Sequence, residues 1–134
     1  MDRLTTEQRS VNMAAIRGRN TLPEIQVRKL LHRLGYRFRL HDRRLPGTPD
    51  IVLPRFRTVV MVHGCFWHLH GCSKSKIPGT RRAFWVAKLE GNRARDQRQE
   101  EKLKAAGWEV IVVWECEVEV PELLIRRFTA KMPK

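Results

Sequence analysis

The feature that most constrains the fold is a run of metal-binding residue types between residues 63 and 72, "HGCFWHLHGC". This run holds three of the five histidines and two of the three cysteines in the 134-residue chain. A structural zinc ion needs four soft or borderline ligands in a tetrahedron. Cys65, His70 and Cys72 can supply three of them, with the spacing C-x4-H-x-C, so the fourth ligand has to come from another part of the chain.

Cys116 is the remaining cysteine, and it lies just past an apolar segment, "WEVIVVW", at residues 108–114. A second apolar segment, "RTVVMV" at residues 57–62, leads directly into the cluster. If the two segments are parallel neighbours in a sheet, both chain ends emerge at the same edge and a Cys3His site is complete. Such a zinc ion has no open position, so it would be structural; the alternative is three unrelated thiols. His63 and His68 would remain for chemistry.

The rest of the chain alternates between helix and strand signals. Thr21 to Glu24 form a capping box at the start of a helix that Gly35 ends. Periodicity predicts further helices at residues 6–17, 81–106 (interrupted at Gly91-Asn92) and 121–131, and strands at residues 36–40, 50–53, 57–62 and 108–114. The order predicts an α/β fold with a mixed central sheet flanked by helices, and the length allows one domain, residues 1–134.

The formal net charge of +13 indicates a polyanionic partner. A ribosomal or otherwise generic basic protein would have the same composition. The N-terminus has no apolar signal segment and the chain has no run of about 18 apolar residues, so we expect a cytoplasmic protein that does not enter the membrane. In that compartment a Cys/His cluster indicates metal binding rather than disulfides.

A candidate catalytic site lies upstream of the cluster, in "PGTPDIVL". Asp50 opens a strand directly after a proline, and the next strand ends at His63. Nucleases of the PD-(D/E)xK kind use such a hairpin: one strand supplies an aspartate for Mg²⁺, and its neighbour supplies a second acid and a lysine. Here the neighbouring positions, 61–63, read Met-Val-His, so the second acid is missing and a histidine replaces the lysine. Asp50 as a simple turn residue is the alternative.

Hydrolysis of a phosphodiester needs charge neutralisation on the phosphate and an activated water, which a few protein oxygens around Mg²⁺ can provide. Asp50 can supply one oxygen and the backbone carbonyl of Val62 another. An imidazole can accept or donate the proton, which makes His63 and His68 the candidates. Glu24 and Asp96 can hydrogen-bond water molecules around the ion, although Glu24 already has a role in its capping box.

Four motifs together resemble the very-short-patch repair (Vsr) endonucleases: "TPDIVL", "VHGCFWHLHGC", "TRRAFWVAKLEGNRARDQR" and "GWEVIVVWECE". The N-terminal "RSVNMAAIRGRNTLPE" also fits, and the resemblance covers residues 9 to about 117. It implies a PD-(D/E)xK-like core with a degenerate motif and a structural zinc loop. The implied activity is Mg²⁺-dependent, strand-specific nicking 5′ of the T in T:G mismatches, of the sort left when 5-methylcytosine deaminates.

By motif, the resemblance assigns the expected site residues of this sequence. The catalytic residues are Asp50, His63, His68, Glu24 and Asp96, and the structural zinc ligands are Cys65, His70, Cys72 and Cys116. It also implies an aromatic wedge of Phe66, Trp67 and Trp85 that enters the base stack, although Phe66 and Trp67 are equally compatible with a core position. Residues 1–20 would form a DNA-clamping appendage, with Met13 as its inserting residue.

Basic residues near these motifs are expected to contact the DNA backbone. They are Lys74, Lys76, Arg81, Arg82, Arg93, Arg95 and Arg98. The expected partners are double-stranded DNA with a T:G mismatch, mismatch-repair proteins and a DNA polymerase, and a monomer suffices for an asymmetric substrate. Two alternatives remain open: a restriction endonuclease of the same superfamily that cuts both strands, and a zinc-stabilised DNA-binding module without catalysis.

Overall fold

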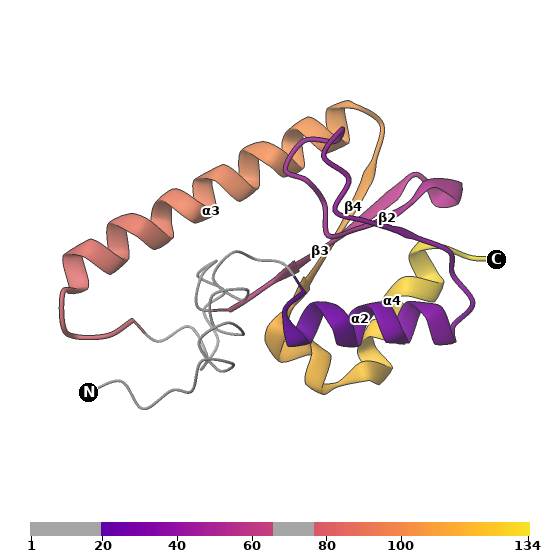
Figure 1. Cartoon of the computed structure of the whole chain (residues 1–134), viewed down its shortest axis with the longest axis horizontal. Coiled ribbons are helices and arrows are strands. Elements are labelled where there is room, and N and C mark those ends of the chain that lie inside the picture. Colours follow the sequence, from indigo (N-terminus) through magenta and orange to yellow (C-terminus); the bar gives the residue numbers. More distant parts are fainter. Residues whose placement is uncertain (1–19, 66–76) are drawn as a thin grey trace.

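A mixed four-stranded sheet separates two layers of helices in the computed structural model, which describes residues 20–65 and 77–134 (Figure 1). Helices α2 and α4 lie on one face of the sheet, and the C-terminal end of the long helix α3 packs against the other. The elements are α2 (Leu22–Arg33), β1 (Arg39–Leu40), β2 (Ile51–Leu53), η1 (Pro54–Phe56), β3 (Thr58–His63), α3 (Arg82–Ala105), β4 (Glu109–Trp114), η3 (Glu115–Glu119) and α4 (Pro121–Lys131).

The strand order is β1-β2-β3-β4, with antiparallel pairing up to β3 and a parallel β3–β4 pair. The parallel register runs from Thr58 opposite Glu109 to His63 opposite Trp114. The two apolar segments of the sequence are therefore parallel neighbours, which is the condition that a shared Cys3His site requires. Their carboxyl ends meet at one edge of the sheet.

The core divides into two parts because alternate strand residues point to opposite faces. Val60 and Ile51 pack in the larger part, together with α2 and α4. Val59 and Val52 pack on the other face against Leu103 of α3. By the same alternation, the residues that follow Val59 at every second position of β3, ending at His63, point toward the α3 face.

Two helices have the predicted limits. Helix α2 begins with Thr21 as N-cap, whose hydroxyl accepts a hydrogen bond at 3.4 Å from the backbone N–H of Glu24. Gly35 follows the helix with a φ of 86°, a left-handed conformation that favours glycine. Helix α4 spans the predicted residues, Pro121–Lys131.

The predicted interruption of the third helix at Gly91-Asn92 is wrong. Helix α3 runs without a break for 24 residues. A single glycine weakens a helix by only about 1 kcal/mol, and the buried side chains of Leu89 and Leu103 hold α3 on both sides of it. Asn92 does not cap a new helix; its Oδ1 accepts a hydrogen bond at 3.2 Å from Arg95, one turn further along.

The first strand is shorter than predicted. Only Arg39–Leu40 pairs with β2, whereas the alternation predicted a strand over residues 36–40. Tyr36 is buried instead in the core beside α4, where its hydroxyl donates a hydrogen bond at 2.7 Å to the carbonyl of Met132. Burial raises the pKa of Tyr36, so the hydroxyl stays a donor.

Several predictions concern residues outside the described ranges. They are the helix at residues 6–17, Met13, Phe66, Trp67, His68, His70, Cys72, Lys74 and Lys76. Within residues 20–65 and 77–134, no helix combines the length and apolar character needed to cross a membrane.

Candidate active site

The Asp50 carboxylate lies at the sheet edge where β3 and β4 end. Asp50 directly precedes β2, and its Oδ2 accepts a hydrogen bond at 2.7 Å from the backbone N–H of Val62 on β3. The N–H and carbonyl of one strand residue point to the same side of the strand. The Val62 carbonyl therefore faces the same side as the Asp50 carboxylate, so the two oxygens expected to hold Mg²⁺ lie on one edge.

Burial raises the pKa of Asp50 to about 7, and the negative charges of Glu24 and Asp96 act in the same direction. The hydrogen bond from Val62 and the charge of Arg28 lower this pKa but do not offset the burial. The Asp50 carboxyl therefore titrates near neutral pH in the metal-free protein. The charge of Asp96 reaches Asp50 from α3, on the face toward which β3 turns its alternate residues.

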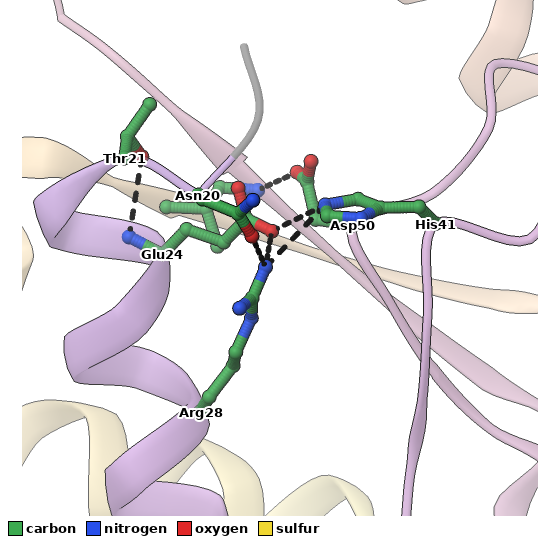
Figure 2. A network of polar contacts seen from close by, with 7 residues as sticks. Asn20, Thr21, Glu24, Arg28, His41 and Asp50 are labelled. Atoms are coloured by element: carbon green, nitrogen blue, oxygen red, sulfur yellow. Dashed lines mark hydrogen bonds and ion pairs between the residues drawn. The ribbon is translucent and has the colours of Figure 1, made fainter. Parts of the chain in front are cut away.

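Glu24 places a second carboxylate beside Asp50. Its side chain is only 1% exposed, and its Oε1 lies 2.6 Å from the imidazole Nε2 of His41 (Figure 2). The same oxygen is paired with the guanidinium of Arg28, whose Nη2 also donates to Asn20 Oδ1 at 2.8 Å. The predicted capping box is therefore only half present: the backbone N–H of Glu24 donates to the Thr21 hydroxyl, whereas the Glu24 carboxylate belongs to this site.

The spacing of these groups fits a divalent cation. One ligand atom each from Glu24, His41 and Asp50 lie within 4.8 Å of one another. Carboxylate oxygens are the ligands that Mg²⁺ prefers, and an imidazole nitrogen suits other divalent metals. A cation at Asp50 would also offset the burial and the smaller repulsion from Glu24 and Asp96 that raise the pKa of this carboxyl. The two carboxylates therefore fit the expected metal, and the His41 imidazole contacts one of them.

His63 is the last residue of β3 and directly follows Val62. Its side chain is 7% exposed and packs edge-on against the ring of Trp114, with ring centroids 5.2 Å apart and planes at 74°. The parallel pairing of β3 and β4 sets this contact, because His63 and Trp114 are register partners. His63 thus shares a sheet edge with Asp50.

Two of the four expected zinc ligands lie together just beyond the strand ends. The Sγ of Cys65 accepts a hydrogen bond at 3.4 Å from the backbone N–H of Cys116, and the N–H of Cys65 donates to Glu115 Oε1, also at 3.4 Å. Thiolate sulfurs are among the ligands that a structural zinc ion takes. The parallel strands thus join residues 51 positions apart, as expected for a shared site.

The predicted DNA-contacting residues of the described chain lie on α3 and at its start. Arg81, Arg82, Arg93, Arg95 and Arg98 are all exposed. The guanidinium of Arg81 lies 4.4 Å from the ring centroid of Phe84, which is 46% exposed and in edge contact with Trp85. This end of α3 therefore presents aromatic rings among cationic groups, a combination found on nucleic-acid-binding surfaces.

Arg28 and His41 belong to the site but are not predicted from the sequence motifs. Arg28 lies one helical turn after Glu24, and this i,i+4 spacing is a signal for an ion pair. His41 carries no such local signal. It reaches the site because β1 pairs antiparallel with β2, which places the backbone N–H of His41 3.2 Å from the carbonyl oxygen of Asp50.

The chain is similar in sequence to known endonucleases. Residues 1–74 match the family model for the DNA mismatch endonuclease Vsr. The type II nicking enzyme V.XorIIP of Xanthomonas oryzae pv. oryzae is 57% identical over 117 residues, which cover 87% of this chain and 86% of the relative. The DNA mismatch endonuclease Vsr of Escherichia coli K12 is 46% identical over 108 residues, which cover 81% of this chain and 69% of the relative.

A further relative is the type II nicking enzyme V.NmeAIP of Neisseria meningitidis serogroup A, 47% identical over 117 residues, which cover 87% of this chain and 84% of the relative. These matches put the chain in a family of endonucleases. It belongs to the DNA mismatch endonuclease Vsr family, and the resemblance seen in the sequence motifs is confirmed.

Proposed function

We propose that this protein is a strand-specific DNA endonuclease that nicks 5′ of the T in a T:G mismatch by Mg²⁺-dependent hydrolysis. The observation that carries the proposal is the Asp50 carboxylate bonded to Val62 at the end of the β2–β3 hairpin, with Glu24 beside it, in a chain of the Vsr family. A bound cation would explain why two carboxylates lie together in a protein with a formal net charge of +13.

In this proposal Asp50 and the Val62 carbonyl hold Mg²⁺, which when bound supplies charge neutralisation at the phosphate and lowers the pKa of water. His63 and His68 divide the proton transfers between them: one accepts the proton of the attacking water and the other gives a proton to the leaving 3′-oxygen. Glu24 and Asp96 orient water by hydrogen bonding. The products are a 3′-hydroxyl and a 5′-phosphate.

The zinc site of the proposal comprises Cys65, His70, Cys72 and Cys116 and is structural. Its support is the contact between Cys65 and Cys116. Because Cys65 is two residues from His63, a zinc ion there would fix the chain directly after the catalytic strand. A PD-(D/E)xK-like core with a zinc loop is consistent with the mixed sheet and its flanking helices.

The proposed DNA interface combines a wedge with cationic contacts. Phe66, Trp67 and Trp85 would enter the base stack, and Met13 would insert from the N-terminal appendage. A mismatched step opens more easily than a paired one, so a wedge also discriminates against matched DNA. The exposed arginines of α3, together with Lys74 and Lys76, would neutralise phosphates.

The substrate has one target strand, so we propose a monomer with a single domain over residues 1–134. Mismatch-repair proteins and a DNA polymerase would act after the nick to replace the short patch. Because the relatives V.XorIIP and V.NmeAIP are named nicking enzymes, single-strand cleavage is favoured over a restriction enzyme that cuts both strands.

The test uses a T:G duplex with each strand labelled, a matched T:A duplex, and protein with zinc retained, with or without Mg²⁺. We expect one nick, 5′ of the mismatched T, that needs Mg²⁺. Asp50→Asn keeps an acceptor for the Val62 N–H but removes the charge, and it should abolish nicking while DNA binding survives. Cleavage of both strands would favour the restriction enzyme, and no cleavage of any mismatch would favour the non-catalytic module.

A further inference from the structure

We propose that His41 is a positioning residue that holds the Glu24 carboxylate beside Asp50. The inference rests on the proposed nuclease function and adds a residue to it. The imidazole Nε2 of His41 lies 2.6 Å from Glu24 Oε1, within hydrogen-bonding distance (Figure 2). Glu24 is buried, so such a bond also satisfies a carboxylate removed from water.

His41 contacts both acidic residues through different atoms. Its backbone N–H donates to the carbonyl oxygen of Asp50 at 3.2 Å, and its ring contacts the side chain of Glu24. Asp50 belongs to the start of β2, whereas Glu24 belongs to the first turn of α2. One residue therefore links the two elements that carry the carboxylates.

The second partner of Glu24 cannot perform this role. Arg28 lies on the same helix, four residues further along, so its ion pair with Glu24 does not tie the carboxylate directly to the sheet; toward β1, its Nη2 approaches, among the described residues, only the Nε2 of His41, at 3.4 Å. His41 approaches from the sheet side, after β1. Without His41, Arg28 alone would direct the Glu24 carboxylate, and its distance from Asp50 would no longer be fixed.

The backbone of His41 has a left-handed conformation. Its φ is 46°, in the left-handed region that residues with a Cβ seldom adopt. The following turn supports it, because Asp42 Oδ1 accepts a hydrogen bond at 3.0 Å from the backbone N–H of Arg44.

The test compares three substitutions with wild type. His41→Gln places an amide N–H near the position of the imidazole Nε2, and His41→Asn carries the same amide on a shorter side chain. We expect His41→Ala and His41→Asn to lower kcat for nicking by about 10–100-fold, the usual effect of losing a group that orients a metal site. KM for DNA should change little, and His41→Gln should recover most of the lost rate.

Binding of Mn²⁺ to the DNA-free protein, measured by calorimetry, supplies a readout independent of nicking. We expect His41→Ala to weaken it about 10-fold and His41→Gln to restore it. If wild type fails to nick but these affinities shift as expected, the proposed function is wrong and the positioning role stands. If wild type nicks and His41→Ala matches it in both rate and affinity, the positioning role is refuted.

A double-substitution cycle tests whether His41 acts through Glu24. In a Glu24→Gln background, His41→Ala should cause little further loss of rate, because the carboxylate that it positions is already gone. Full additivity of the two losses would refute the inference. If His41→Ala does not fold, the comparison of His41→Gln with His41→Asn tests the inference instead. Equal losses of nicking rate in these two variants would also refute the positioning role.

Discussion

The carboxylate of Asp50 accepts a hydrogen bond at 2.7 Å from the backbone N–H of Val62, on the neighbouring strand. Val62 is followed directly by His63, so this bond fixes the acidic group relative to the strand end that carries a candidate proton carrier. The bond also lowers the pKa of Asp50, against the stronger effect of burial. Asp50→Asn is therefore the most direct probe of the site, because it keeps the acceptor and removes the titration.

Asp50 should make the stability of the Mg²⁺-free protein depend on pH. Its folded pKa of about 7 is above the value of about 3.9 in an unfolded chain. The contribution of Asp50 to the free energy of unfolding is therefore fully present below about pH 4. It is lost as the pH rises through 7, a change on the order of 2–4 kcal/mol. Urea unfolding at several pH values measures it.

The matched control for this titration is Asp50→Asn, which should show a flatter stability profile between pH 4 and 7. Mg²⁺ binding below pH 7 should release a proton in wild type, since the cation needs the ionised carboxylate. Parallel profiles for the two proteins would mean that Asp50 does not titrate as described.

Cys116→Ser should lose its zinc and destabilise the chain beyond β3. Cys116 contacts Cys65 through its backbone, and a closed zinc site depends on all four ligands. We expect the zinc content, measured by atomic absorption, to fall from one equivalent to a small fraction of it. His32→Ala, an exposed histidine on α2, should retain one equivalent. Full zinc content in Cys116→Ser would remove residue 116 from the ligand set.

Gly91→Ala should stabilise the protein by about 1 kcal/mol, because alanine favours a helix interior that glycine weakens. A Cβ at position 91 would meet no atom within 4 Å among the described residues. Gly107→Ala is the opposite case: its φ of 91° strains any other residue, and its Cβ would lie 3.3 Å from Arg57. Urea unfolding should therefore give a higher free energy of unfolding for Gly91→Ala than for wild type and a lower one for Gly107→Ala. A destabilised Gly91→Ala would contradict the continuous helix.

Arg98→Ala should reduce the salt dependence of DNA binding. If this exposed residue of α3 contacts a phosphate, the slope of log K against log salt should become shallower by about 0.9. Arg126 is also exposed but lies on α4, across the sheet from α3, so Arg126→Ala should leave the slope unchanged. Fluorescence anisotropy over a salt series measures both. Equal slopes for all three proteins would place the DNA away from this part of α3.

Local patterns predicted the elements on which the site depends. Two apolar runs predict that β3 and β4 are neighbours in the sheet; their parallel pairing, which a shared zinc site requires, brings Cys65 and Cys116 into contact. The proline-aspartate pair likewise predicted that Asp50 lies beside the end of β3. These predictions succeed because strand pairing brings residues with clear local signals to a common edge.

The remaining features depend on energies or contacts that the sequence does not display. The cost of Gly91 is small compared with the packing of a long helix, so its helix-breaking signal was misleading. Tyr36 packs in the core and bonds to Met132, directly after α4, instead of extending β1. The role of His41 depends on two separate contacts, the pairing of β1 with β2 and the contact of its ring with Glu24 on α2. Neither contact produces a pattern in the neighbouring sequence.

The continuity of α3 has a mechanical consequence. At about 1.5 Å per residue, its 24 residues form a rod roughly 36 Å long, close to one turn of B-DNA. Figure 1 shows one end of this rod against the sheet and the other well beyond it. Leu103, near the first end, packs against Val59 of β3, and Phe84 lies at the far end. A displacement of Phe84 by bound DNA would thus be transmitted along the unbroken helix α3 to β3, the strand that ends at His63.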